Sequence, residues 1–164
     1  MKNYYFKEKI FKITDHYAIL DDDGNTAYYV DQDFKLLGYK STISDKNKKL
    51  ILTIDKEIFS LFQKFNVNFI DGKYMRVESR LSFFTRKIDI DYNGEDLTLR
   101  GKLLDLNFEI FKDNNLIAEI EKTFFAMTDT YMLTVHDENY TEALLGLTLC
   151  LNNIKDTNNS RANN

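Results

Sequence analysis

The chain has 164 residues, of which 43% are apolar and 14% aromatic, and its net charge is −4. This composition can fill a sizeable core in one domain and excludes wholesale disorder. The modest acidity argues against a general nucleic-acid binder, because such a protein needs a basic surface to displace counterions from phosphates.

The N-terminus and the cysteine content bear on where the protein works. Residues 1–8 lack the apolar stretch of a secretory signal. No apolar run reaches the roughly 18 to 20 residues that span a bilayer. Cys150 is the single cysteine, so no intrachain disulfide is expected. We therefore expect a cytoplasmic protein without a transmembrane segment, peripheral to the membrane if it meets one.

Turn signals recur along the chain at a nearly even pace of roughly 20 to 26 residues. Asp-Gly and Asn-Gly pairs favour tight hairpins because these residues tolerate a positive φ. These and similar polar turns stand at Asp23-Gly24, Asp45-Lys46-Asn47, Asp71-Gly72, Asn93-Gly94 and Asp113-Asn114-Asn115. The spacing leaves room for two short strands between successive hairpin tips, which is typical of an all-β barrel or sandwich.

Between these turns, apolar and polar residues alternate with the period of a strand. Phe65, Val67 and Phe69, for example, alternate with Asn66 and Asn68. Residues 88–92, 97–100, 106–110 and 133–136 follow the same pattern. Such alternation places one face of a strand in a core and the other in water. The pattern predicts about twelve strands in a mainly antiparallel β domain.

The segment from residue 140 to residue 154 departs from this pattern. Its apolar residues cover nearly every face of a helix, and Asn139 followed by Glu142 is typical of a capping box. A helix that is apolar all round must be surrounded, so we expect the strands to wrap it. Contact with a membrane or a partner is the alternative. The polar residues 155–164 are expected to form a disordered tail, which leaves residues 1–154 as a single domain.

One aromatic frame occurs three times in the chain. In each copy, six positions separate two aromatic residues and six more lead to an aspartate. The copies are Phe11, Tyr17 and Asp23; Phe59, Phe65 and Asp71; and Phe125, Tyr131 and Asp137. We interpret the frame as a repeated supersecondary unit with aromatic residues in the core and turn aspartates. Three copies of a binding site are the alternative.

Several segments in this order resemble one known family. They are residues 9–17, 22–25, 28–30, 34–38, 58–61, 65–73 and 122–131, followed by the apolar helix. Together they resemble the LURP-one-related family, although its members often carry tryptophan in the region of residues 125–128 and this chain has none. That family is similar to the tubby C-terminal domain and the phospholipid scramblases. The resemblance implies a closed barrel of about twelve antiparallel strands around a central hydrophobic helix.

No catalytic or metal-binding constellation stands out. Residues 21–25 lack the ligand spacing of a calcium loop and are predicted to form a hairpin turn. By strand alternation, His16 and His136 face away from the core, and they do not form a metal-spacing pair. Cys150 lies in the predicted helix and is expected to be a small buried hydrophobe. We expect no catalytic residue, no metal, no cofactor and no enzymatic activity.

Four of the five arginines fall in one stretch: Arg76, Arg80, Arg86 and Arg100. Arginine binds phosphate with two parallel hydrogen bonds, so these residues are candidates for contact with an anionic lipid headgroup. Acidic residues are interleaved with them, at Glu78, Asp89, Asp91, Glu95 and Asp96. These carboxylates favour the competing interpretation, in which the stretch is an ordinary solvated strand face of mixed charge.

These observations leave two main hypotheses about function. The first is a non-catalytic binding module that contacts anionic, phosphoinositide-like phospholipid headgroups through its outer surface. The second is a structural or protein-interaction domain with no small-molecule ligand. Tubby domains bind phosphoinositides, but the chain does not match the basic motif that they use, so the resemblance assigns no site. A barrel filled by its own helix leaves little lumen for a substrate, which ranks an enzyme last.

Overall fold

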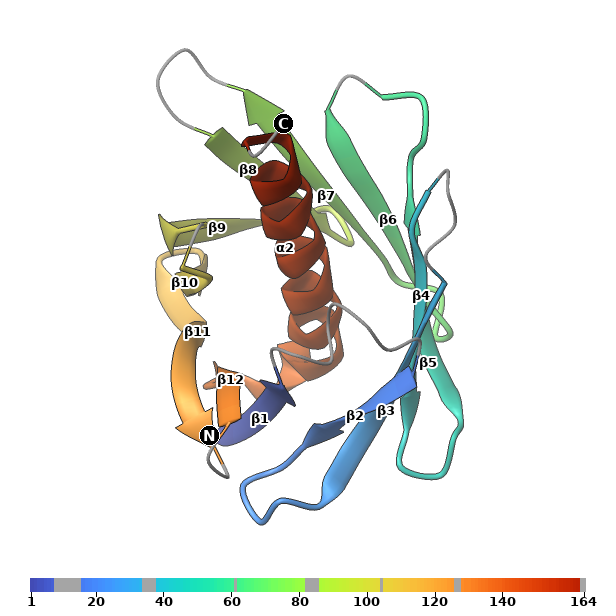
Figure 1. The fold of residues 1–164 in the computed structure, drawn as a ribbon, viewed down its shortest axis with the longest axis vertical. Helices are drawn as coiled ribbons and strands as arrows, with labels where there is room; N and C mark the ends of the chain where they lie inside the picture. Colours follow the sequence, from blue (N-terminus) through green and yellow to red (C-terminus); the bar gives the residue numbers. More distant parts are fainter. Residues whose placement is uncertain are drawn as a thin grey trace.

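The computed structural model describes residues 1–7, 16–33, 38–60, 62–81, 86–103, 105–125 and 128–162. In this part of the chain, twelve strands form a closed barrel around one long helix, as the sequence predicts (Figure 1). The strands are β1 (Lys2–Lys7), β2 (His16–Leu20), β3 (Thr26–Asp33), β4 (Lys40–Asp45), β5 (Leu50–Lys56), β6 (Gln63–Phe69), β7 (Tyr74–Leu81), β8 (Arg86–Tyr92), β9 (Glu95–Lys102), β10 (Asn107–Lys112), β11 (Asn115–Phe125) and β12 (Thr128–Val135). A short 3-10 turn, η1 (Glu138–Tyr140), and the helix α2 (Thr141–Ala162) follow.

The strand order around the wall follows the chain, and each strand runs antiparallel to its neighbours. β1 closes the barrel against β12, with Lys2 opposite Val135 and Lys7 opposite Thr130. The predicted alternation holds along the wall. In β6, for example, Phe65, Val67 and Phe69 are buried, whereas the residues between them are not. The wall therefore has an apolar inner face and a polar outer face.

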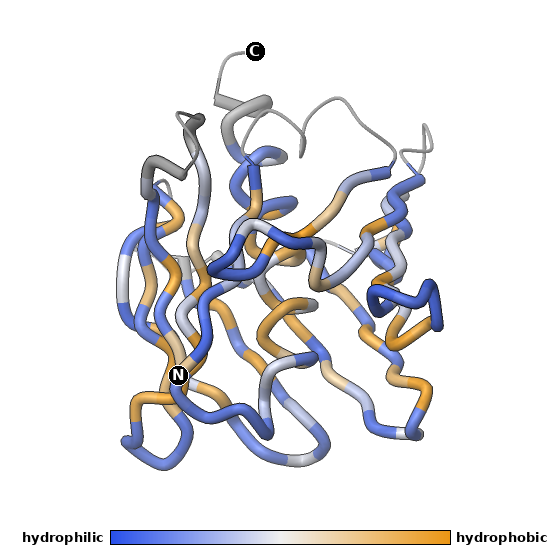
Figure 2. The backbone as a smooth tube through the Cα atoms, turned by 90° about the horizontal axis from the view of Figure 1, so that it is seen from below, coloured by the Kyte–Doolittle hydropathy of each residue, from blue (hydrophilic) through white to orange (hydrophobic). Residues whose placement is uncertain are grey.

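The helix α2 lies inside this wall, as Figure 2 shows from another side. Residues 143–152 are all buried, so the helix is itself the centre of the core. Gly146 lets it approach the wall closely: a Cβ at this position would lie 3.3 Å from the side chain of Leu52 and 3.5 Å from that of Val67. Of the two sequence interpretations, burial inside the barrel is the one that the structure shows.

The cap of the helix differs from the prediction. The backbone of Asp137 is extended, and its carboxylate accepts a hydrogen bond from the backbone N–H of Asn139 at 3.0 Å. The turn η1 then precedes α2, and Thr141 Oγ1 donates to the carbonyl oxygen of Glu138 at 2.8 Å. The predicted capping box at Asn139 and Glu142 is therefore wrong, because Asn139 lies within η1 with its backbone N–H bonded to Asp137, the N-cap of that turn, and α2 begins only at Thr141.

The helix also continues past residue 154, through most of the segment expected to be a disordered tail, and ends at Ala162. Lys155 is only 4% exposed, and its Nζ donates to the hydroxyl of Tyr131. From the wall, Lys56 Nζ donates to Asn153 Oδ1 at 2.8 Å and to Thr157 Oγ1 at 3.2 Å. This polar sequence stays helical because the lumen at this end supplies hydrogen-bond partners.

The threefold aromatic frame is confirmed only in part. The second aromatic residue of each copy is buried, at Tyr17, Phe65 and Tyr131. Phe59, however, is 100% exposed, because it lies in the connection between β5 and β6 and not on a strand. Its assignment to the core is therefore wrong. Phe11 and the side chain of Phe125 lie outside the described part of the chain.

Cys150 offers a direct test of helix burial in solution. The side chain is completely buried in α2, and this burial raises the pKa of its thiol. Since the thiolate is the reactive form, we expect Ellman's reagent to label the native protein at least about two orders of magnitude more slowly than the urea-unfolded chain. Rapid labelling in native buffer, with an unchanged circular dichroism spectrum, would contradict the enclosed helix.

Candidate functional site

Strands β8 and β9 pair only next to the turn that joins them. Across residues 86–103, which are described without a gap, Ile90 lies opposite Leu97, Asp91 opposite Asp96 and Tyr92 opposite Glu95, and the register goes no further. On its other edge, β8 pairs with β7 from Tyr92 back to Arg86. The two strands therefore part beyond Ile90 and open a gap in the wall.

A close backbone approach lies on the far side of β9, at the end that is not paired with β8. Gly101 of β9 has a φ of +142°, and a Cβ there would lie 2.0 Å from the carbonyl oxygen of Asn107 and 2.9 Å from the Cα of Phe108. Only glycine allows the backbones of β9 and β10 to come so close. The end of β9 thus lies tight against β10, on the side away from β8.

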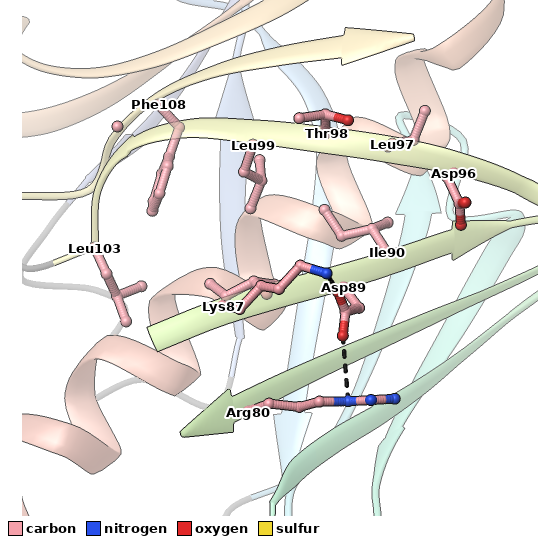
Figure 3. A pocket seen from close by; sticks show the side chains of 12 residues that line it. Arg80, Lys87, Asp89, Ile90, Asp96, Leu97, Thr98, Leu99, Leu103 and Phe108 are labelled. Carbon is pink, nitrogen blue, oxygen red and sulfur yellow. Dashed lines mark ion pairs between the residues drawn. The ribbon is translucent and has the colours of Figure 1, made fainter. Parts of the chain in front are cut away.

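A cleft of about 560 Å³ occupies the gap. Its floor is formed by apolar residues of β8, β9 and β10 and of the segment after β9: Ile88, Ile90, Leu97, Leu99, Leu103 and Phe108. Ile90, Leu97 and Phe108 are buried, and the other three pack against the same core. Figure 3 shows Leu99 and Phe108 on one side and Ile90 on the other, directed into the space between the strands. The cleft therefore leaves Ile88, Leu99 and Leu103 partly accessible, above a layer of buried core residues.

The rim of the cleft is polar and charged. Its side chains are Arg80, Lys87, Asp89, Asp96 and Thr98. Asp89 binds one cation with each carboxylate oxygen: Oδ2 lies 3.2 Å from Arg80 Nε, and Oδ1 lies 2.9 Å from Lys87 Nζ (Figure 3). Arg80 Nε also lies 3.0 Å from Glu78 Oε1. Two cations are thus held side by side over an apolar floor by carboxylates that an anionic ligand could replace.

The structure distributes the four predicted arginines over three neighbouring strands. Arg76 and Arg80 share the outer face of β7, as predicted, and Arg76 lies opposite Asp91 of β8. Arg100 of β9 stacks on Phe111, with its guanidinium carbon 4.3 Å from the ring centre. Arg86 begins β8, and its side chain lies outside the described part of the chain. Of the described three, only Arg80 lines the cleft, where Lys87 accompanies it.

The other residues singled out from the sequence make local contacts. Asp21 Oδ1 accepts hydrogen bonds from the backbone N–H groups of Asp23 and Asn25, which confirms the predicted hairpin turn. His16 lies beside Asp31 and His136 beside Glu119, both on the outer surface. Within the described residues, no group of three or more histidine, cysteine, aspartate or glutamate side chains could hold a metal ion. Nor does any helix described there combine the length and hydropathy that a bilayer crossing requires.

Comparisons with known proteins agree with this architecture. The chain is 24% identical over 132 residues to a Bacillus subtilis (strain 168) protein called "Uncharacterized protein YxjI", and the match covers 80% of each chain. An X-ray structure of an Arabidopsis thaliana protein is similar in fold, with a TM-score of 0.62, 12% sequence identity, and coverage of 93% of this chain and 90% of that one. The family model of LURP-one-related proteins matches residues 2–152. With nearly its whole length matched, the chain belongs to the LURP-one-related family.

Proposed function

We propose that the chain is a non-catalytic binding module that holds an amphipathic molecule, a lipid with an anionic headgroup, in the β8–β9 cleft. The apolar part of the ligand would lie against Ile88, Leu99 and Leu103, the partly exposed apolar residues of the cleft. The headgroup phosphate would sit on Arg80 and Lys87. One observation carries the proposal: paired cations stand over an apolar floor at the place where two strands of the wall part.

The chemistry of the rim suits a phosphate. Arginine offers a planar fork of donors that matches phosphate oxygens, and lysine adds a point charge. In the free protein, Asp89 pairs with both cations and Glu78 also pairs with Arg80, so a phosphate has to compete with two carboxylates. The cleft volume of about 560 Å³ falls in the range of small-ligand sites. With the cytoplasmic location expected from the sequence, the membrane would be a cytoplasm-facing leaflet, where anionic lipids give a negative surface potential.

Vesicle sedimentation at low salt tests the headgroup site. We compare neutral phosphatidylcholine vesicles with vesicles that also contain a phosphoinositide. Arg80→Gln and Lys87→Gln should each weaken binding to the anionic vesicles about fivefold, since a cation near an anionic surface contributes about 1 kcal/mol. Asp89→Asn should strengthen it by a similar factor, because it removes the carboxylate that pairs with both cations.

Lys73→Gln serves as the matched control, because Lys73 is an exposed lysine with a carboxylate partner, Asp71, 2.8 Å away. Both lie in the turn between β6 and β7, at the opposite end of the barrel from Arg80 and Lys87. The control should change binding by less than about twofold. Equal losses from Lys73→Gln and Lys87→Gln would mean that only overall charge matters. Equal binding of neutral and phosphoinositide vesicles by the unmodified chain would refute the anionic-headgroup proposal.

A second candidate function is a protein-interaction domain with no small ligand. The observation that favours it is the mixed charge of this face, where Glu78 and Asp89 already pair with Arg80. The facing edges of β8 and β9, unpaired with each other beyond Ile90, would also accept an extended segment from a partner. In that case Asp89→Asn would leave vesicle binding unchanged, and a stable partner would be recovered with the purified chain.

A further inference from the structure

The connection between β5 and β6 carries two exposed apolar side chains. Ile58 is 51% exposed and Phe59 is 100% exposed. Ile58 rests on the backbone of Gly38, where a Cβ would lie 3.4 Å from Ile58 Cδ1. Phe59 stands beyond it and projects into solvent. A fully exposed aromatic side chain at the tip of a connection adds nothing to the barrel core and is available for contact with another molecule.

The position of this pair along the barrel relates it to the cleft. Neighbouring strands alternate in direction, so the connection from β5 to β6 lies at the barrel end where β7 ends and β8 begins. The β8–β9 cleft widens toward that same end, because the two strands stay paired only at the opposite turn. The C-terminal half of α2 also lies there, as its bonds to Lys56 show. Ile58, Phe59 and the open side of the cleft thus lie at the same end of the barrel.

The turns at the opposite end are of a different kind. They comprise residues 21–25, 45–49, 70–73, 93–94 and 113–114, and they are built mainly of Asp, Asn, Gly and Lys. In Figure 2, blue turns line the edge opposite the C-terminus. Five exposed apolar or aromatic side chains of the described residues also lie at this end, in these turns or near the starts of strands: Met1, Leu50, Ile70, Tyr74 and Leu116. The ion pair of Asp71 with Lys73 at 2.8 Å lies next to Ile70. The end with Ile58 and Phe59 differs in that Phe59 is fully exposed and the open side of the cleft lies beside it along the barrel axis.

We propose that Ile58 and Phe59 insert into the interface of a lipid bilayer and stand the barrel on the membrane with the open side of its cleft toward the lipid. A projecting pair at a loop tip is too small for a stable protein interface, which buries about 800 Å² on each partner. The same pair suits a bilayer interface, where aromatic and aliphatic side chains enter singly and bind reversibly. Insertion requires no anionic lipid, so the inference goes beyond the headgroup site and stands apart from it.

Tryptophan fluorescence tests the insertion without relying on affinity. The chain contains no tryptophan, so Phe59→Trp places a single reporter at the tip. We expect its emission to shift to shorter wavelength with phosphatidylcholine vesicles and to be quenched by brominated lipid. Ile70→Trp, at the opposite end, is the matched control and should show neither change. An unshifted Phe59→Trp spectrum at saturating lipid, or equal responses at both positions, would overturn the proposal.

Partitioning and molecular mass complete the test. Phe59→Ser should weaken binding to neutral and anionic vesicles alike by about tenfold, the effect of losing one buried large apolar side chain, whereas Ile70→Ser should not. No binding to either vesicle would refute the insertion.

A dimer seen by light scattering and lost in Phe59→Ser would assign the tip to a second copy instead. If Phe59→Trp responds while Arg80→Gln and Lys87→Gln have no effect, the insertion stands and the headgroup site fails. If Arg80→Gln and Lys87→Gln weaken binding while Phe59→Trp does not respond, the headgroup site stands and the insertion fails.

Discussion

Replacing Leu147 with aspartate is expected to leave the chain without a folded barrel. Leu147 is completely buried in α2, within a run of buried residues from 143 to 152. A carboxylate at this position would exchange its hydration for apolar neighbours, at a cost of several kcal/mol. Domains of this kind have total stabilities of about 5 to 15 kcal/mol, so one such substitution removes much or all of it. Loss of the β-sheet circular dichroism signal and aggregation on size exclusion are the expected results.

The control for this substitution is Leu147→Met, which nearly conserves volume and should cost less than about 1.5 kcal/mol. The pair of variants also separates the two interpretations of the helix. A helix that merely leaned on a membrane or a partner would tolerate aspartate, and the variant would be folded and more soluble. A folded, monomeric Leu147→Asp protein would therefore contradict a helix that forms the core.

The barrel and its central helix could be predicted because both leave a binary pattern in the sequence. One-sided burial forces alternation such as that of Phe65, Val67 and Phe69, and enclosure forces the helix to be apolar all round. The details at both ends of the helix could not be predicted in this way. The cap at Asp137 and the polar helical turns after Ile154 depend on hydrogen-bond partners that only the tertiary structure supplies. Tyr131 is such a partner for Lys155.

The candidate site was harder to predict than the fold. The outward placement of Arg76 and Arg80 follows from alternation, and the structure agrees. The cleft leaves no comparable trace, because Lys87 and Asp89 alternate with Ile88 and Ile90 just as they would in a fully paired strand. The single sequence signal of the parting is a glycine inside a strand, Gly101, which indicates a close backbone approach but does not say which neighbour is lost.

Replacing Gly101 with alanine is expected to destabilise the barrel by about 2 to 4 kcal/mol. About 1 kcal/mol comes from forcing a residue with a Cβ into a positive φ, here +142°. A further 1 to 3 kcal/mol, roughly, comes from the overlap of that Cβ with the carbonyl oxygen of Asn107, only 2.0 Å away. Backbone atoms cannot move aside as a flexible side chain can, so β9 has to leave β10. Urea unfolding followed by circular dichroism measures the loss.

Gly94→Ala separates the two contributions. Gly94 lies in the turn between β8 and β9 and has a φ of +84°, but an added Cβ would have nothing within 4 Å. This control should cost only the conformational part, about 1 kcal/mol. The difference between the variants then measures the cost of the overlap that the added Cβ creates between β9 and β10. Equal costs would show that β9 can leave β10 without penalty. The close approach at Gly101 would then not explain why the end of β9 parts from β8.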